Sequence, residues 1–269
     1  MKTINRIFFS LLFIGTLFSG CKKASPVGSM PDHFVKRALI EETTAEWCCD
    51  CPPGGDMINS LKTAFGDKLV AVSIHDRDFL DMSGIYDPIA SALGESIGQF
   101  PTATIDRSPG SAGGQYWDYY SNWNSDIQTE LSKDNNTGIA MTTSIQGSTA
   151  SVEVHVGYHT TNNYDMRLNV YLIENNIPQQ TQCAGPSGPP DPGYVHQQVL
   201  RQVATPALGD PISMSAGSEV VKKYTFNIGG YTPSNLVAVA FVEKWGGTGN
   251  DAAVFNSRQV RLGEIATWQ

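Results

Sequence analysis

The spacing of apolar residues changes along the chain, and the change divides it into two parts. In the first part, apolar runs that suit strands alternate with a segment of helical period. Strands are predicted at Arg37–Thr44 and Lys68–His75, and a helix is predicted between them at Asp56–Phe65. The second strand is almost continuously apolar, which is typical of a parallel strand buried on both faces. This order predicts an α/β unit.

Further elements complete that unit. A segment rich in small residues, Pro88–Ile97, has helical character, and Gln99–Asp106 is predicted to be a strand with a proline near its start. Gln115–Leu131 carries aromatic and aliphatic residues at helical spacing, so we expect a helix that covers one face of the sheet. The polar segment Lys133–Gly138 then indicates a break.

After this break the apolar period becomes two. Short alternating segments are separated by turn residues, and no helical pattern lies between them. Such a series predicts an antiparallel β-sandwich. The predicted strands are Ile139–Ile145, Ala150–Val156, Arg167–Ile173, Val220–Phe226 and Leu236–Val242. We therefore expect an α/β domain at residues 35–135 and an all-β domain at residues 136–269.

The N-terminus has the pattern of an export signal. Lys2 and Arg6 precede the apolar run Ile7–Phe18, which is too short to span a bilayer as a helix. The small residues before Cys21 resemble a bacterial lipobox, so residues 1–20 are predicted to be a lipoprotein signal peptide, with Cys21 lipidated. Cleavage by the ordinary signal peptidase, with an unmodified Cys21, is the alternative. Residues 21–34 would form a tether to the membrane.

The residues after Cys21 bear on the location. No Asp follows Cys21 directly, which by analogy with bacterial sorting rules favours the outer membrane. The tether also lacks the acidic run associated with display on the cell surface, which favours the periplasmic face. We expect a protein of the cell envelope, held at the membrane by its lipid.

Charge narrows the range of partners. The formal net charge is -8 at pH 7, and removal of Lys2 and Arg6 with the signal peptide makes it more negative by two. An acidic chain has no electrostatic footprint for nucleic acid, and binding to anionic lipid headgroups is disfavoured. The sequence therefore predicts no nucleic-acid partner.

The segment Trp47–Pro52 contains the chemistry-bearing motif, a Cys-x-x-Cys pair that directly follows a predicted strand. Two intervening residues allow both sulfurs to lie in the first turn of a helix, where they can bond and where the helix dipole favours a thiolate. On this basis Cys48 is the attacking thiol and Cys51 resolves the mixed disulfide. Asp50, beside Cys48, favours a reducing or weakly oxidising couple.

The accessory thiols leave alternatives open. Cys49 could divert the bond of the Cys48–Cys51 pair, and Cys183, in a loop by composition, could be a surface thiol, a partner of Cys49, or a thiol that exchanges with the first site. The cluster could also be a static disulfide or a zinc site, although no second Cys pair completes a zinc ligand set. Copper(I) handling by thiolates with a nearby histidine is a further alternative. We predict no metal and no cofactor.

The Cys motif and a proline further along the chain resemble a known superfamily. Trp47-Cys48-x-x-Cys51-Pro52, followed about fifty residues later by Phe100-Pro101-Thr102, resembles the thioredoxin superfamily. The resemblance implies that Pro101 is cis and faces the Cys pair, where its backbone would position an extended substrate. It also implies that Glu42, six residues before Cys48, is a buried acid that moves a proton of the inner thiol. An edge-strand proline and a solvated acid are the ordinary alternatives.

The whole chain resembles the Omp-type lipoprotein family of Bacteroidetes, in which a thioredoxin-like part precedes a β-rich part. The matching segments are Leu39–Glu42 before the Cys motif, Tyr194–Arg201, and Val239–Val242. Within the second of these, His196 and Arg201 are interpreted as structural anchors or as part of a binding surface. The resemblance implies fold and location more than substrate. His75, at the end of a strand, is either near the site or a capping residue.

Two functional classes follow. In the first, the protein is a membrane-tethered thiol-disulfide oxidoreductase acting on thiols or disulfides of envelope proteins through Cys48, Cys51, Pro101 and Glu42, with an unidentified redox partner. In the second, it is a non-catalytic binding or assembly lipoprotein of the outer membrane, and its disulfide is structural.

Overall fold

The computed structural model describes residues 25–82, 88, 91, 100–111, 116–160, 164–178, 182–183, 191–245 and 252–269. The predicted signal peptide, Cys21 and most of the expected helix at Pro88–Ile97 lie outside these residues. The described chain is mostly β, with few helices.

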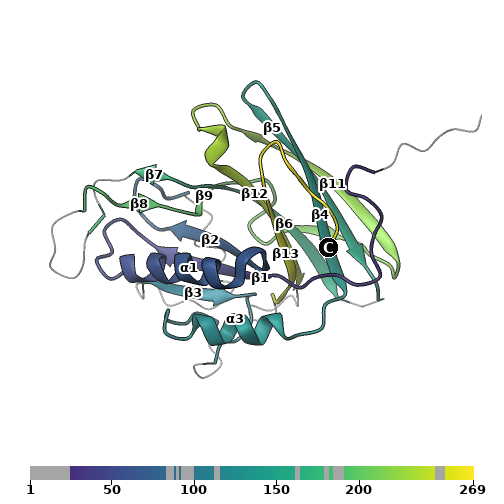
Figure 1. Cartoon of the computed structure of the whole chain (residues 1–269), viewed down its shortest axis with the longest axis horizontal. Helices are drawn as coiled ribbons and strands as arrows, with labels where there is room; N and C mark the ends of the chain where they lie inside the picture. The colour runs from purple at the N-terminus through teal and green to yellow at the C-terminus, as the bar shows by residue number, and fades with distance from the viewer. Residues whose placement is uncertain are drawn as a thin grey trace, which may run out of the picture.

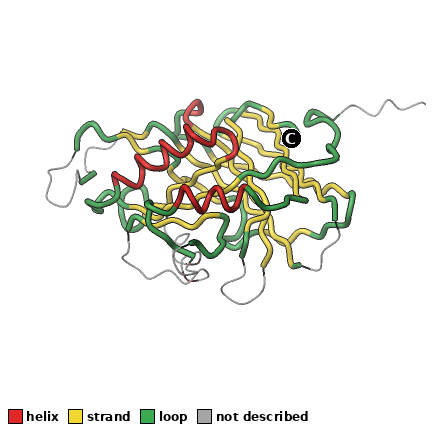
Figure 2. Tube along the Cα trace, turned by 60° about the horizontal axis from the view of Figure 1, so that its bottom comes forward, coloured by secondary structure: helices red, strands yellow, loops and turns green. Residues whose placement is uncertain are grey.

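The first part of the chain forms one end of a large sheet. β1 (Ala38–Thr44) and β2 (Leu69–His75) pair in parallel, and β3 (Thr102–Ile105) pairs antiparallel with β1. Helices α1 (Pro52–Phe65) and α3 (Trp123–Leu131) lie over one face of these strands (Figures 1 and 2). A single turn of 3-10 helix, Gly66–Lys68, connects α1 to β2. The apolar positions predicted for strand and helix form the core between them.

The second part supplies the long strands visible in Figure 1. β4 (Thr137–Gln146), β5 (Thr149–Tyr158), β11 (Ser218–Asn227) and β14 (Ile265–Ala266) form a four-stranded sheet in the order β11-β5-β4-β14. β6 (Asp165–Glu174) and β12 (Leu236–Trp245) pair antiparallel in the large sheet, with β13 (Val254–Arg261) next to β12. Every strand predicted in this part is present. β13, β14 and the short strands between β6 and β11 were not predicted.

The large sheet runs through both parts of the chain. Its order is β13-β12-β6-β9-β2-β1-β3, with β10 (Asp210–Ile212) paired to β6. β9 (Val199–Val203) connects the parts: it is antiparallel to β6, and it meets β2 in parallel at Ser73 and Val199, where the Ser73 amide donates to the Gln198 carbonyl at 2.8 Å. The α/β part is therefore not a separate sheet. The boundary between residues 135 and 136 stays a prediction.

β6 and β12 lie between two apolar clusters because successive side chains of a strand point to opposite faces. One face of β6, with Leu168, Val170 and Leu172, packs against β4 and β5. The other face, with Tyr171 and Ile173, belongs to the cluster that holds residues of β1 and β2. The sheet thus curls so that its two ends face each other across a shared interior.

The remaining described elements are short. β7 (Ile177–Pro178) and β8 (Val195–His196) form a separate two-stranded sheet, and Pro233–Asn235 is a 3-10 turn before β12. β8 brings His196 to the end of β2, as described below.

The helix expected at Gln115–Leu131 begins only at Trp123. The backbone of Asp118 does not form helical hydrogen bonds, because it exchanges two hydrogen bonds with Ala103 at 2.9 and 3.0 Å. Trp117 packs into the interior cluster, whereas Trp123 and Ile127 pack beneath the strands as the spacing predicted. The helical period was right for the second half of the segment and wrong for the first.

Candidate functional site

The two cysteines of the motif are joined by a disulfide in a tight turn after β1. The Cys48–Cys51 bond is 2.07 Å long, with Cα atoms 5.4 Å apart, within the usual range for disulfides. The Cys51 amide donates to the Cys48 carbonyl at 3.3 Å, which closes the turn. Both side chains are buried in the interior cluster.

Helix α1 begins after the motif, at Pro52, with Cys51 as its N-cap. The expectation that both sulfurs lie in the first helical turn was therefore wrong. In a continued helix, the amides of Pro52 and Pro53 would have to donate to the carbonyls of Cys48 and Cys49, and proline has no amide hydrogen. Both prolines are tolerated in the first turn, where amides have no helical partner.

A second disulfide joins the motif to the β-rich part. Cys49 bonds to Cys183 across a sequence separation of 134 residues, which is one of the alternatives that the sequence left open. The Cys183 amide donates to the Glu46 carbonyl at 3.1 Å, and the buried Gln182 side chain donates to the Cys48 carbonyl at 3.0 Å. Residues 182 and 183 thus lie against the backbone of the motif.

Pro101 lies beside the start of α1. The Phe100-Pro101 peptide bond is cis. A Cβ placed on Gly54, in the first turn of α1, would come within 2.9 Å of the Pro101 side chain, so the glycine allows this close approach. Phe100 packs against the half-exposed ring of Trp47, with ring centroids 5.6 Å apart. The structure therefore gathers Pro101, Trp47 and the Cys pair in one place.

Glu42 is fully buried below the same helix start. Its Oε2 accepts a hydrogen bond from the Ser73 hydroxyl at 2.9 Å, and its Oε1 has no partner among the described residues. A Cβ on Gly54 would lie 2.7 Å from that Oε1. Burial raises the pKa of Glu42 to about 8, because removal from water disfavours the carboxylate more than the Ser73 hydrogen bond favours it. Glu42 can therefore hold a proton at neutral pH.

A small polar cavity continues from Glu42 toward the surface. Its volume is about 20 Å³, enough for one water molecule, and its lining includes Glu42, His75, Tyr194 and His196. The Nε2 atoms of both histidines are buried and have no hydrogen-bond partner among the described residues. Burial and the neighbouring His75 lower the pKa of His196 to about 4, so His196 is neutral at pH 7.

His75 is held by an acid rather than exposed. Its Nδ1 lies 2.7 Å from Oδ2 of Asp78, whose other hydrogen bonds come from the amides of Glu46 and Leu80. These interactions outweigh burial and lower the pKa of Asp78. Across the described residues, no three His, Cys, Asp or Glu side chains converge in a way that could hold a metal ion.

The adjacent acid, Glu41, points to the opposite face of β1, into the interior. Arg107 donates to both of its carboxylate oxygens, at 2.7 and 2.8 Å, and to Glu243 at 2.6 Å. Burial lowers the pKa of Arg107, but the two carboxylates outweigh that effect and raise it. Glu41 is thus part of a buried ion network on the face of β1 opposite to Glu42.

Pro101 and Glu42 both lie against Gly54, whose amide donates to the Cys51 carbonyl at 2.9 Å, while Cys21 lies outside the described residues. Sequence reasoning missed Ser73, Gly54 and Gln182, and it did not connect Tyr194 and His196 to this site. The only sequence feature that pointed to Tyr194 and His196 was their position in the segment Tyr194–Arg201, which matches the family resemblance. Arg201 pairs with Glu174 at 3.3 Å.

The geometry defines a mostly β protein with a disulfide-bonded Cys-x-x-Cys motif at the end of a buried strand. The chain belongs to the Omp28 outer membrane protein family, whose model matches residues 94–265. That match begins after the Cys motif, so membership by itself says nothing of redox chemistry. No curated protein sequence matches the chain.

Solved structures share the fold. HBP35 of Porphyromonas gingivalis matches with a TM-score of 0.73 and 18% identity, over 91% of this chain and 78% of that one. Protein AGR_C_4864 from Agrobacterium tumefaciens matches with a TM-score of 0.55 and 13% identity, over 86% of this chain and 96% of that one. At these identities the likeness is one of fold alone. None of the helices in the described residues has the length and apolarity to cross a bilayer.

Proposed function

We propose that this protein is a thiol-disulfide oxidoreductase of the cell envelope, with Cys48 as the nucleophile and Cys51 as the resolving thiol. The observation that carries the proposal is the position of Gly54, which lies against Pro101 and the protonatable Glu42 and donates its amide to the Cys51 carbonyl at 2.9 Å, while Oε1 of Glu42 has no partner among the described residues. The unit formed by β1, α1, β2 and β3 is then thioredoxin-like, with a sheet extended by strands of the β-rich part. A purely structural disulfide would not need an acid of raised pKa beneath it.

The proposed exchange transfers two electrons from a pair of substrate thiols to the cysteine pair. A substrate thiolate attacks Sγ of Cys48, a bond forms between the two sulfurs, and the Cys48–Cys51 bond breaks with its electron pair on Cys51. Glu42 gives its proton to the Cys51 thiolate. A second substrate thiolate then releases Cys48, so two electrons pass from substrate to the cysteine pair. The same steps in reverse reduce a substrate disulfide. Trp47, about half exposed next to Cys48, offers an apolar contact for an extended substrate segment.

The proposed location rests on two grounds, the family to which the chain belongs and the pattern of its N-terminal residues. The Omp28 family is one of outer membrane proteins. The predicted tether is packed against the β-rich part from Val27 to Phe34, so only the residues before Val27 could serve as one. With a lipid on Cys21, the site would face the periplasm, where envelope proteins with thiols or disulfides are the substrates.

The reduction potential of the Cys48–Cys51 couple tests the proposal. The protein is equilibrated in glutathione buffers, its thiols are trapped, and the adducts are located by mass. We expect a potential between about -120 and -270 mV, with Cys48 trapped first. A bond that stays oxidised below about -300 mV, or a Cys48 that never reacts, contradicts catalysis.

Variants of the two disulfides separate their roles. Cys48→Ser is expected to abolish exchange with a model disulfide substrate and to leave the fold intact. The matched control is Cys49→Ser with Cys183→Ser, which removes the other bond and should preserve exchange. If the control loses exchange while Cys48→Ser keeps it, the reactive bond is Cys49–Cys183.

A second candidate function is a non-catalytic binding or assembly lipoprotein. It is favoured by the burial of Cys48, which is only 6% exposed, and by the Cys49–Cys183 bond across the two parts of the chain. In this case Cys48→Ser lowers stability, leaves partner binding unchanged, and the wild-type bond resists reduction.

A further inference from the structure

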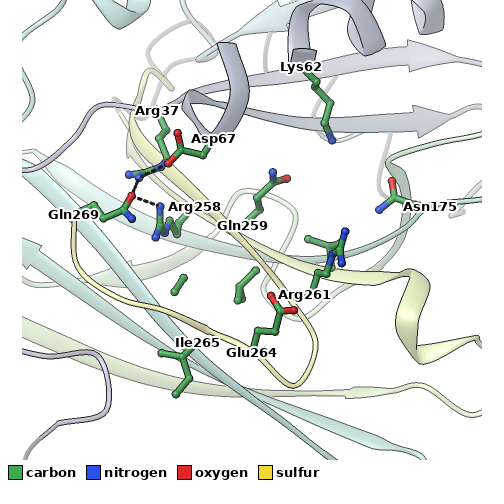
Figure 3. A pocket seen from close by; sticks show the side chains of 13 residues that line it. Arg37, Lys62, Asp67, Asn175, Arg258, Gln259, Arg261, Glu264, Ile265 and Gln269 are labelled. Carbon is green, nitrogen blue, oxygen red and sulfur yellow. Dashed lines mark hydrogen bonds and ion pairs between the residues drawn. The ribbon is translucent and has the colours of Figure 1, made fainter. Parts of the chain in front are cut away.

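A pocket with cationic walls lies at the opposite end of α1 from the cysteines. Its volume is about 450 Å³, and it lies among the last turn of α1, strand β13 and the segment around β14 (Figure 3). Its charged lining consists of Arg37, Lys62, Arg258, Arg261, Asp67 and Glu264, which we call the cationic pocket. Four cationic against two acidic side chains leave a surplus of two positive side-chain charges in a chain whose formal net charge is -8.

The acids of the pocket compensate these cations only weakly. Arg37 pairs with Asp67 at 3.2 Å, but the Asp67 side chain is 70% exposed, so water and salt screen the pair. Among the described residues, Lys62, Arg258 and Arg261 take part in no ion pair. Burial lowers the pKa of Lys62 because no anion offsets the loss of water.

Two of the cations are buried next to each other. Arg37 and Arg258 are 3% and 8% exposed, and both donate to Oε1 of Gln269, a neutral acceptor that Arg258 reaches at 3.0 Å. The Nε atom of each has no partner among the described residues. Burial, and then the charge of Arg37, lower the pKa of Arg258 to about 10. Two like charges held out of water with only the exposed Asp67 to compensate them are costly unless a further anion joins them.

The other two cations face the middle of the pocket. In Figure 3, Lys62 extends from α1 and Arg261 extends from β13 toward the same space, which Gln259 and Asn175 also border. This arrangement supplies one ammonium, one guanidinium and two amides, all able to donate to oxygen.

We propose that the cationic pocket binds the phosphate group of a small molecule. A phosphate monoester carries close to two negative charges at neutral pH, which matches the surplus, and its oxygens accept from guanidinium and ammonium groups together. The volume leaves room for an organic group on the ester, against the apolar side chains of Val260 and Ile265. The phosphate source is either a soluble ester or a lipid headgroup. This site is independent of the cysteine chemistry.

Calorimetric titration of the full-length protein with inorganic phosphate and with glycerol 3-phosphate tests the proposal. We expect saturable binding that weakens as salt increases. Lys62→Gln with Arg261→Gln should lower the affinity at least about ten-fold, since each lost charge-assisted hydrogen bond is worth about that factor. Lys222→Gln with Lys223→Gln, on β11, removes the same charge elsewhere and should leave the affinity within about two-fold.

Melting temperatures of both double variants establish that they remain folded. No saturable binding of either compound, or equal loss of affinity in the two double variants, would overturn the proposal. Sedimentation with vesicles that contain phosphatidic acid, whose headgroup is a phosphate monoester, compared with phosphatidylcholine vesicles, distinguishes the sources. Vesicle binding that depends on Lys62 and Arg261 identifies a lipid headgroup, whereas glycerol 3-phosphate binding without vesicle binding identifies a soluble ester.

Discussion

Glu41 and Glu42 are neighbours in the chain, buried on opposite faces of the same strand, and they differ in how their charge is compensated. Glu41 receives two hydrogen bonds from Arg107, which also binds Glu243. Glu42 receives one hydrogen bond from a neutral hydroxyl and leaves its second oxygen without a partner in the described structure. The two side chains are buried to nearly the same extent, so the difference between them comes from the group that each carboxylate is bonded to.

The difference separates a structural acid from one suited to proton transfer. A buried carboxylate that is paired with a cation contributes to the fold only while that partner is present. An unpaired one takes up a proton, which costs less than an isolated buried charge, and that proton is then available for chemistry. The face of β1 with the unpaired acid is also the face against Gly54 and Pro101.

Removal of the arginine should have the largest effect on stability. Arg107→Met leaves Glu41 and Glu243 buried without their cation, and we expect it to lower the free energy of unfolding by about 3–5 kcal/mol. Urea unfolding measures the change. Lys223→Met is the control, because its pair with Glu153 is exposed and should be worth less than about 1 kcal/mol. Similar losses in both variants would mean that the interior network does not compensate charge.

The pH dependence of stability should reveal the unpaired acid. Glu42 keeps its proton up to about pH 8 in the native protein but releases it near 4.5 when unfolded. Between these values the unfolded state binds fewer protons, so stability falls as pH rises, by about 1.4 kcal/mol per pH unit from this group.

Glu42→Gln should remove that slope, which amounts to about 3 kcal/mol between pH 5.5 and 7.5. Urea unfolding at a series of pH values, with wild type and variant side by side, measures it. Glu264→Gln, at an exposed acid, should leave the slope as it is in the wild type. A slope in Glu42→Gln as steep as that of the wild type would show that Glu42 is ionised in the native protein.

The close contact around Gly54 can be tested by adding one methyl group. Gly54→Ala places a Cβ within 3 Å of both Glu42 and Pro101, so we expect a loss of about 1–3 kcal/mol in the free energy of unfolding. Gly193→Ala is the control, because its Cβ would meet nothing closer than 3.4 Å. If both variants unfold at the same urea concentration, the helix start is free to move away from Glu42.

Local features of the site could be predicted from the sequence. The strand before the cysteines, the proline at the start of β3 and the choice of Glu42 each depend on nearby residues or on a spacing along the chain. The burial of both Glu41 and Glu42 was not predicted. Successive side chains of a strand point to opposite faces, so only one of two neighbours is buried when the other face meets solvent. Both faces of β1 are covered, one by α1 and α3 and the other by the interior cluster.

By itself, the sequence determined the period of each segment, and hence most strands, the helix α1 and the Cys-x-x-Cys pair, since these depend on residues a few positions apart. Tertiary structure alone decided which distant segments meet. It joined Cys49 to Cys183, placed Gln198 beside Ser73, and supplied Arg107 to Glu41 but, among the described residues, no cation to Glu42. Such partners are selected by the packing of the whole chain, because a side chain's own neighbours in sequence do not specify what lies across a sheet.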